Sequence, residues 1–343
     1  MRSVIAHGPG DVRVDDAPDP EISGPDGAIV AVEATAICGS DLHFYDGDLP
    51  FFPVALGHEA IGRIVEIGPQ VQRFRVGDRV LVSSVAGCGR CPGCATLDPI
   101  RCHAGAQVFG SGLLPGAQSS LLAVPAADFQ LLAVPEGIDD DAALLLTDNL
   151  ATGWVGASRG RVVPGDTVVV LGLGAVGQCA ARAALAHGAA RVLAVDPVEG
   201  RRERAAAAGA VPLAGETPAR VLEETDGVGA DVVIDAVANN ASLDTAFASV
   251  RAGGTVSVLG IHDMEPYPLG ATMGVFRSVT MTMNTAPVQQ TWPDLVPMLT
   301  SGRLDVSGII TQRFDLEQAA EAYAAVAART ADTMKVVLTV GNH

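Results

Sequence analysis

The chain has 343 residues, which suggests two domains at roughly 150 residues each, and 48% of its residues are hydrophobic, enough to form buried cores. Its 22 Lys and Arg residues against 39 Asp and Glu residues give a formal net charge of -17. This charge disfavours binding to nucleic acid and adhesion to an anionic membrane.

The N-terminal residues and the apolar stretches also disfavour export and membrane insertion. Residues 1–16 lack the apolar stretch of a signal peptide, and residues 167–181 are too short and too rich in glycine to span a bilayer. Six cysteines, mostly clustered, do not form the pattern of a disulfide scaffold. We therefore expect a cytoplasmic protein that starts at Met1 and uses thiols for metal binding or catalysis.

The first part of the chain, up to about residue 145, consists of short runs of alternating polarity broken by Gly and Pro. This pattern is typical of a β-rich domain. We expect strands at residues 28–33, 61–67 and 78–83. Residues 104–120 fit no pattern, and we interpret them as a segment that could shape a substrate entrance.

Two motifs in this region carry potential metal ligands. Cys38-Gly-Ser-Asp-Leu-His43 offers a thiol and an imidazole, and Gly57-His58-Glu59 adds an imidazole and a carboxylate. Taken singly, Cys38 or His58 would more often be a packed core residue. Together the motifs contain the roughly three protein ligands that a catalytic zinc needs while one position stays open.

Four further cysteines lie in one short glycine-rich loop, at Cys88, Cys91, Cys94 and Cys102. A loop of this kind lets four short side chains converge on one tetrahedral ion. We predict a structural zinc with no open position, which orders a lobe and does no chemistry. His103 adjoins the last cysteine and is an alternative ligand, but four thiolates are the simpler set.

From about residue 162, strands alternate with helices, which is the pattern of a doubly wound parallel sheet in an α/β domain. The expected strands are residues 167–171, 191–195, 231–235 and 254–259. The expected helices are an alanine-rich one ending near His187 and two more at residues 200–208 and 242–250. A helix at 294–300 and a strand at 335–340 are too little for a third domain, so we expect them to rejoin the first.

The strand at 167–171 leads into Gly172-Leu-Gly174-Ala175-Val176-Gly177, a dinucleotide-binding fingerprint that opens a helix. Its glycines would allow a tight turn, close approach of a pyrophosphate and close packing of helix on strand. Asp196 ends the next strand, where an acid can bind the adenosine ribose hydroxyls. An ordinary turn with a surface aspartate is the less favoured alternative, because strand, turn, helix and acid occur in register. Cys179 is interpreted as a small buried residue.

Together these motifs resemble those of the zinc-dependent medium-chain alcohol dehydrogenases over nearly the whole chain. The matching pieces are, in order, Cys38–His43, Gly57-His-Glu-Ala-Ile-Gly62, Val76-Gly-Asp-Arg-Val80, the four-cysteine loop and Gly172–Gly177. The resemblance implies a GroES-like β-rich catalytic domain at residues 1–152 and 288–343. It also implies a Rossmann NAD-binding domain at residues 153–287 and an active site between the two domains.

The resemblance further implies roles for single residues near the catalytic zinc. Cys38 and His58 would hold the metal, and Asp148 stands where the family has its third ligand. Glu59 is similar to a nearby carboxylate that can take the place of substrate or water on the metal. Asp41 is similar to the acid that orients the ligating imidazole.

Three more residues resemble the family's proton relay and cofactor contacts. Ser40 and His43 would carry a proton from the alcohol through the nicotinamide ribose to solvent. Thr152 is similar to a contact near the nicotinamide. The alternatives are a solvated surface position for His43 and an ordinary helix start for Thr152.

We therefore predict an NAD-dependent alcohol dehydrogenase or carbonyl reductase with two zinc ions per chain. An apolar primary or secondary alcohol, or the matching ketone or aldehyde, is favoured by the aromatic residues around the expected site, which are Phe44, Tyr45, Phe51, Phe52 and Trp154. A polyol, sugar or threonine dehydrogenase of the same superfamily is an alternative. A non-catalytic nucleotide-binding relative is disfavoured by the joint presence of four potential zinc ligands.

Two further expectations concern the cofactor and the assembly. NAD is expected over NADP because the carboxylate of Asp196 would repel a 2′-phosphate, while Arg201 and Arg202 are expected to point to solvent or to the adenine. We also expect a homodimer or homotetramer, with residues 254–259 and 278–283 as candidate sheet-edge contacts.

Overall fold

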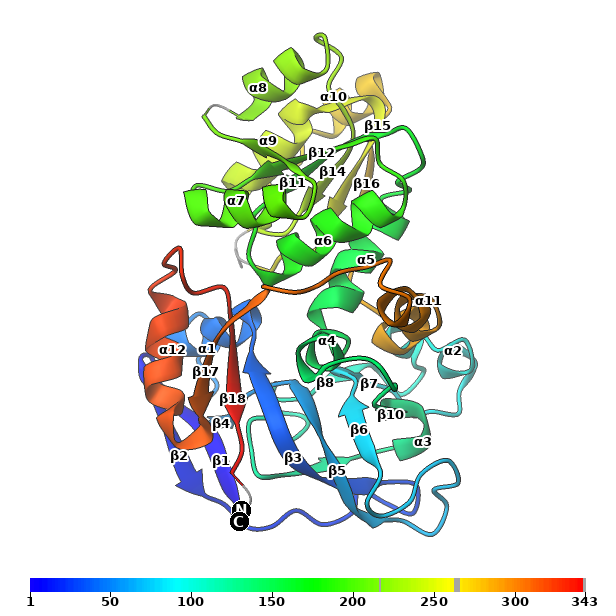
Figure 1. The fold of residues 1–343 in the computed structure, drawn as a ribbon, viewed down its shortest axis with the longest axis vertical. Helices are drawn as coiled ribbons and strands as arrows, with labels where there is room; N and C mark the ends of the chain where they lie inside the picture. Colours follow the sequence, from blue (N-terminus) through cyan, green and yellow to red (C-terminus); the bar gives the residue numbers. More distant parts are fainter. Residues whose placement is uncertain (216, 262–265, 342–343) are drawn as a thin grey trace. The chain divides into compact units, whose positions relative to one another are not determined.

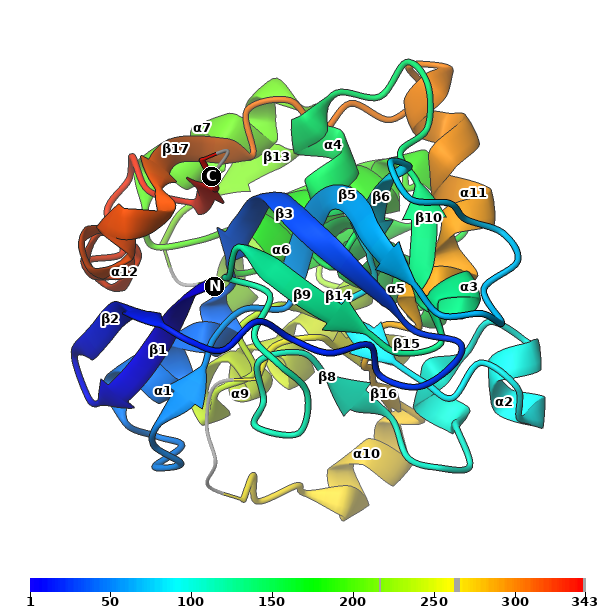
Figure 2. The same ribbon diagram turned by 90° about the horizontal axis from the view of Figure 1, so that it is seen from below.

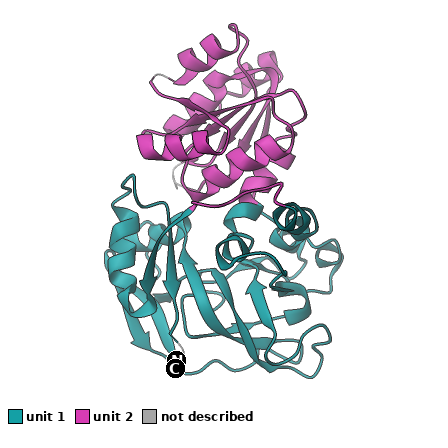
Figure 3. Cartoon of the chain, in the orientation of Figure 1, with its two compact units in different colours: residues 1–151, 286–301, 310–343 teal, residues 152–285, 302–309 magenta. Residues whose placement is uncertain are grey.

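The structure, a computed structural model, describes residues 1–215, 217–261 and 266–341 (Figure 1). The chain divides into two compact units, which Figure 3 colours separately. Unit 1 comprises Met1–Ala151, Ala286–Ser301 and Ile310–His343, and unit 2 comprises Thr152–Thr285 and Gly302–Ile309. The chain therefore leaves unit 1 twice and returns to it twice.

The second segment outside unit 1, Gly302–Ile309, is called the excursion below. It was expected in the first domain, but it belongs to unit 2. Two observations explain why it belongs to unit 2. The side chains of Leu304, Val306 and Ile309 are buried. In addition, Nε of Arg182 donates a hydrogen bond of 3.0 Å to the carbonyl oxygen of Asp305.

The largest sheet of unit 1 places strands from the two ends of the sequence next to each other (Figures 1 and 2). Its order is β10 (Leu131–Ala133), β6 (Arg79–Val82), β5 (Glu59–Ile67), β3 (Ala28–Ile37), β18 (Lys335–Thr339) and β17 (Ile310–Asp315), and β9 (Leu121–Val124) also pairs with β3. β3 is almost entirely apolar and is largely buried along its length, which suits its interior position. β18 is antiparallel to β3 and parallel to β17.

Smaller elements complete unit 1. One small sheet contains β2 (Asp11–Asp16), β1 (Arg2–Gly8) and β4 (Val54–Ala55), and another pairs β7 (Val85–Ala86) with β8 (Gln107–Val108). The α-helices are α1 (Leu42–Asp46), α2 (Pro92–Ala95), α3 (Ala127–Gln130), α4 (Asp140–Leu145), α11 (Val288–Thr300) and α12 (Ala319–Ala327), and the 3-10 helices are η1 (Gly39–Asp41), η2 (Pro99–Arg101) and η3 (Leu316–Gln318). α5 (Asn149–Arg159) carries the chain into unit 2.

Unit 2 is a doubly wound α/β fold with one parallel sheet. The strand order is β13 (Val211–Leu213), β12 (Arg191–Val195), β11 (Thr167–Leu171), β14 (Ala230–Asp235), β15 (Val250–Val258) and β16 (Thr280–Met283). All neighbouring strands are parallel. The helices are α6 (Ala175–Ala186), α7 (Glu199–Ala207), α8 (Thr217–Glu224), α9 (Asn240–Ser249) and α10 (Ala271–Arg277).

The strand order of unit 2 determines where a ligand can bind. The chain runs outward from β11 through β12 to β13, and then returns to start again at β14 on the other side of β11. The crevice at the carboxyl ends of β11 and β14 is the switch point of the sheet, where ligands of this fold bind. The fold therefore has the predicted organisation, a β-rich unit and a doubly wound parallel-sheet unit of the Rossmann type. In the described part of the chain, no helix is both long and apolar enough to cross a membrane.

Candidate active site and metal centres

Four potential ligands of the first metal centre come from three places in unit 1. Cys38 follows β3, His58 immediately precedes β5, Glu59 is the first residue of β5, and Asp148 lies between α4 and α5. The antiparallel pairing of β3 with β5 brings Ala36 opposite Glu59. The end of β3 and the start of β5 therefore lie side by side, and the turn before α5 supplies the remaining carboxylate.

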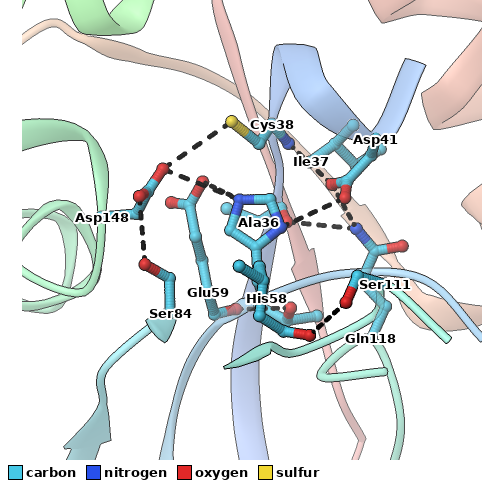
Figure 4. A network of polar contacts seen from close by, with 12 residues as sticks. Ala36, Ile37, Cys38, Asp41, His58, Glu59, Ser84, Ser111, Gln118 and Asp148 are labelled. Atoms are coloured by element: carbon cyan, nitrogen blue, oxygen red, sulfur yellow. Dashed lines mark hydrogen bonds and ion pairs between the residues drawn. The ribbon is translucent and has the colours of Figure 1, made fainter. Parts of the chain in front are cut away.

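The ligand atoms of these four side chains converge (Figure 4). All lie within 4.8 Å of one another. His58 Nε2 is 3.6 Å from Asp148 Oδ2, and Cys38 Sγ is 3.7 Å from the same oxygen. Ligand atoms around a tetrahedral zinc are separated by about 3.4–3.8 Å, because the metal–ligand bonds are about 2.0–2.3 Å long. The donor set and its spacing therefore fit zinc.

A buried network fixes the orientation of the His58 imidazole. Its Nδ1 lies 3.3 Å from Asp41 Oδ1. The other oxygen of Asp41 accepts hydrogen bonds from the backbone N–H of Cys38 (2.9 Å) and from Nε2 of Gln118 (3.2 Å), whose Oε1 in turn accepts one from Tyr323 (2.8 Å). Asp41 thus occupies Nδ1 and directs Nε2 toward the other ligands, as the resemblance implied.

The electrostatics of this centre favour a bound cation. Burial disfavours the charged imidazolium of His58, yet Asp41 and Asp148 raise the pKa of His58 well above its ordinary value. For Asp148, burial opposes ionisation, but hydrogen bonding and attraction to His58 lower the pKa to about 2. Asp41 at Nδ1 and Asp148 near Nε2 thus favour positive charge at the imidazole, and a metal ion bound to Nε2 would supply such a charge.

Asp148 is held by two residues that the sequence analysis did not single out. Its Oδ1 accepts a hydrogen bond of 3.1 Å from Ser84, and its Oδ2 accepts one of 2.8 Å from Nδ2 of Asn149. The motif Leu-Thr-Asp-Asn-Leu placed Asn149 beside the ligand in sequence, but nothing in it indicated which side chain would orient the carboxylate.

Glu59 is fully buried and is paired with Lys335, which is also buried. Lys335 Nζ donates to Glu59 Oε1 and, over 3.1 Å, to the carbonyl oxygen of Ile37. Burial raises the pKa of Glu59, whereas the negative groups around Lys335 outweigh its burial and raise its pKa. Glu59 Oε2 has no hydrogen-bond partner in the described structure. It is therefore the oxygen of Glu59 that is available to a metal ion.

The second centre is the four-cysteine loop, whose sulfur atoms lie within 4.8 Å of one another. Cys91 Sγ is 3.6 Å from Cys94 Sγ, close to the spacing of about 3.8 Å expected on tetrahedral zinc. Backbone N–H groups of Cys94 and His103 lower the pKa of Cys91 to about 6. The backbone N–H of His103 lies 3.4 Å from Cys91 Sγ. The potential ligand group consists of the four cysteine sulfurs and does not include the His103 imidazole.

The dinucleotide fingerprint forms the turn between β11 and α6. A Cβ at Gly177 would lie 1.7 Å from the carbonyl oxygen of Gly172, so the close packing there requires glycine. Gly174 caps the helix, and a Cβ on it would meet no atom within 4 Å. This open space lies beside the first turn of α6, formed by Ala175 and Val176, where unpaired N–H groups can receive a pyrophosphate.

Asp196 follows β12 and is buried, with both carboxylate oxygens already engaged by the backbone. Oδ2 accepts from the N–H of Leu173 (2.7 Å), and Oδ1 accepts from that of Val198 (2.8 Å). Contrary to expectation, Arg201 and Arg202 turn toward this residue. Arg201 lies 3.8 Å from its carboxylate, and Arg202 donates to its carbonyl oxygen over 2.6 Å.

The three remaining predicted residues lie in or next to helices. Ser40 is half-buried in η1, and Thr152 is half-buried in the first turn of α5. His43 is only 8% exposed, so its interpretation as a solvated surface residue is wrong. Its Nδ1 lies 2.9 Å from Oδ2 of Asp48, a partner that the sequence analysis missed.

Most of the aromatic residues that suggested an apolar substrate are used in packing. Phe44 belongs to an apolar cluster of unit 1, and Tyr45 and Phe52 pack against it. In unit 2, the ring of Trp154 contacts that of His187 in a tilted arrangement, with ring centroids 4.3 Å apart. Phe51 is 70% exposed. Packing thus accounts for four of these five aromatic residues, and the apolar alcohol stays a prediction.

Residues 104–120 also have a clearer role than expected. Ala117 and Gln118 donate backbone hydrogen bonds to the carbonyl oxygens of Gly57 and Leu56, over 2.8 and 3.0 Å. The end of this segment thus holds the loop that carries His58, besides supplying the Gln118 side chain.

The chain matches two protein-family profiles. Residues 24–136 match the alcohol dehydrogenase GroES-like domain, and residues 175–301 match the zinc-binding dehydrogenase family. Among related sequences, a probable zinc-binding alcohol dehydrogenase of Mycobacterium tuberculosis is 57% identical over 339 residues, which are 98% of this chain and 88% of that protein.

Two solved structures are similar to this chain over nearly its whole length. An alcohol dehydrogenase from Thermus sp. ATN1 has a TM-score of 0.93 and 34% identity, and covers 99% of this chain and 100% of its own. A zinc-dependent alcohol dehydrogenase from Streptococcus pneumonia, solved in its apo form, has a TM-score of 0.93 and 31% identity, covering 100% and 99%.

Proposed function

Because the chain belongs to the zinc-dependent medium-chain dehydrogenase family and is an oxidoreductase, we propose that it transfers hydride reversibly between an alcohol and NAD in a zinc-dependent reaction. The observation that carries this proposal is the convergence of Cys38, His58 and Asp148 around one point, with His58 oriented by Asp41. Three ligands of this kind leave one position of a tetrahedral ion for substrate.

The residues of the chain divide the chemical work. Zinc would supply a Lewis acid that lowers the pKa of the alcohol hydroxyl, and the nicotinamide would supply a hydride acceptor. Cys38 and Asp148 contribute two negative charges that offset those of the ion. Ser40 and His43 accept the proton of the alcohol. Asp48 orients His43, and because its side chain is 48% exposed, it connects His43 to solvent.

The two centres imply two zinc ions per chain, one at Cys38, His58 and Asp148, and one in the four-cysteine loop. Elemental analysis of metal-replete protein tests this directly. NAD reduction should then be measured with primary, secondary, cyclic and polyhydroxylated alcohols, before and after removal of the metal. We expect activity that is lost with the metal and restored by zinc, and activity that persists without metal would contradict the proposal.

A simple primary or secondary alcohol is the proposed substrate class, and a polyol is the second candidate. Two observations support a polyol as the second candidate: the aromatic residues have a packing role, and the chain is 31% identical to a sorbitol dehydrogenase of Bacillus subtilis. The same alcohol panel separates the two, because a polyol enzyme should turn over sorbitol-like substrates with higher kcat/KM than short monoalcohols.

NAD is the proposed cofactor, although related structures hold either form: one from Escherichia coli is complexed with NADH and one from Sinorhizobium meliloti is bound to NADP. The support is Asp196, whose buried carboxylate would repel a 2′-phosphate at short range. Arg201 and Arg202 lie close enough to favour NADP once this carboxylate is absent. Asp196→Gly should therefore shift the ratio of kcat/KM values toward NADP, and equal or better efficiency of the wild type with NADP would refute the assignment.

We also propose that the chain forms a homo-oligomer through β16. This strand is at the edge of the sheet of unit 2, whereas the other candidate contact, residues 254–259, lies in β15, inside the sheet between β14 and β16. Apolar side chains near β16 are strongly exposed, including Val275 (75%), Phe276 (81%) and Met283 (73%). An unpaired edge beside an apolar surface suits a second copy of the same chain.

A further inference from the structure

A cavity of about 540 Å³ in unit 2 lies apart from the centres described above. Its lining comes from the C-terminal halves of α6 and α7 and from the excursion Gly302–Ile309. The volume lies within the range of about 300–1,000 Å³ typical of small-molecule sites. The cavity is therefore large enough for a metabolite of the size of a sugar phosphate or a tricarboxylate.

The charge of this cavity is opposite to that of the chain. Arg182, Arg204 and Arg303 line it together with a single acidic residue, Asp305, although the chain carries a net charge of -17. In the described part of the structure, the side chains of Arg204 and Arg303 form no hydrogen bond or ion pair. Asp305 is itself engaged, because its two carboxylate oxygens accept hydrogen bonds from the backbone N–H and the hydroxyl of Ser307, over 2.8 and 3.0 Å.

Arg182 is the unusual member of this group because it is 9% exposed and forms no ion pair with a carboxylate among the described residues. Nε donates to the carbonyl oxygen of Asp305, and Nη1 donates to the backbone and side-chain oxygens of Gln178, over 3.1 and 2.9 Å. Burial lowers the pKa of Arg182. A guanidinium offers five N–H donors, and those of Nη2 have no partner among these bonds.

The charge of nearby Asp305 opposes the effect of burial on the pKa of Arg182, but the two groups form no ion pair in the described structure. A buried cation that is only partly compensated is costly, and an anion in the cavity would reduce that cost. Guanidinium groups form two parallel hydrogen bonds with phosphate or carboxylate oxygens, and such charge-assisted bonds are short and strong. Arg182 would supply a fixed donor, while Arg204 and Arg303 could close on the ligand from α7 and from the excursion.

The cavity is separate from the dinucleotide fingerprint. Gly174 caps the N-terminal end of α6, whereas Arg182 lies about 12 Å further along that helix at 1.5 Å per residue. Arg204 is in the last turn of α7, at the opposite end from Asp196. An anion bound here would therefore not occupy the place of the cofactor phosphates.

We propose that this cavity binds a small, multiply charged oxyanion, either a phosphate ester or a di- or tricarboxylate. The ligand would link α6 and α7 to the excursion Gly302–Ile309 and so stabilise the excursion on unit 2. The inference does not depend on the proposed dehydrogenase reaction, because binding and thermal stability can be measured without turnover.

Isothermal titration of the full-length, metal-replete protein tests the site with glycerol 3-phosphate and with tricarballylate, each with and without saturating NAD, in chloride buffer of matched ionic strength. We expect saturable one-to-one binding of at least one probe whether or not NAD is present, with a rise in Tm. The probe that binds more tightly identifies the ligand as a phosphate ester or a carboxylate.

The decisive variant is Arg204→Gln with Arg303→Gln, because neither side chain holds the fold through a polar contact in the described structure. It should weaken anion binding about 10-fold or more, which is the loss of about 1.4 kcal/mol. The matched control is Arg161→Gln, which removes an exposed arginine of unit 2 outside the cavity and should change affinity less than about two-fold. The proposal is overturned if neither probe binds saturably, or if the double variant binds as tightly as the control.

Discussion

Lys335 is the only lysine in the chain, and it is buried beside Glu59 at the first metal centre. Lys335→Met would leave the carboxylate of Glu59 buried without its counter-ion. We expect a loss of about 3–5 kcal/mol in the free energy of unfolding, the usual effect of breaking a buried ion pair. Urea denaturation of zinc-replete protein measures this loss. Lys335→Arg, which keeps the charge, should lose less, and equal losses in the two variants would show that charge is not the cause.

His43 is the residue whose role in proton transfer can be tested by pH. His43→Gln should slow alcohol oxidation by about 100-fold or more and change the pH–rate profile, because it removes the imidazole that is proposed to accept the proton. The profile should be recorded with a deuterated alcohol, so that an isotope effect identifies the hydride step as rate-limiting. An unchanged profile under those conditions would exclude His43 from the relay. Asp48→Asn, which removes its partner, should shift the same profile by a smaller amount.

The candidate ligands could be found from the sequence because each belongs to a compact motif. Gln118, Ser84 and Lys335 could not, since they reach the centre from elements far away in the sequence. Lys335 arrives only because β18 pairs with β3. A side chain that acts through the pairing of distant strands leaves no local pattern from which its role could be predicted.

The four-cysteine loop should contribute to stability and not to turnover. Cys91→Ser should remove one of the two zinc ions and lower the free energy of unfolding by on the order of several kcal/mol, because metal binding contributes directly to folding. Cys38→Ser should instead abolish turnover while the fold is largely kept. Zinc content, thermal unfolding and activity are measured on both variants. Cys179→Ser, a buried cysteine outside both centres, should keep both ions, and equal zinc loss there would contradict the assignment.

At the level of elements, prediction succeeded where one physical constraint dominated. β11 and β12 have the predicted bounds, because buried parallel strands are nearly continuous apolar runs bounded by glycine or polar residues. α11 begins at Val288 and contains Pro293 and Pro297, whereas the prediction started it at residue 294. β17 and α12 were not predicted. Their packing with β18 and β2 is a tertiary effect that a short alternating or alanine-rich sequence does not indicate.

At the level of the whole molecule, the proposed contact through β16 can be tested by charge. Phe276→Asp together with Met283→Asp should place charge on the exposed apolar surface and dissociate the assembly, because burying these carboxylates between subunits would be costly. Sedimentation velocity measures the change in mass. Phe51→Asp alters an equally exposed aromatic residue of unit 1 and serves as the control. A wild-type monomer, or an oligomer that survives the double substitution, would refute the contact.

The strand order of unit 1 also has a consequence for biosynthesis. A ribosome delivers β3 and the ligands of the first centre early, but β18, which lies next to β3 and carries Lys335, is delivered near the end of the chain. Nearly all of unit 2 is synthesised in between. The ammonium group that compensates Glu59 is therefore synthesised after all four potential ligands of the first centre, and the buried pair can form only once β18 has emerged.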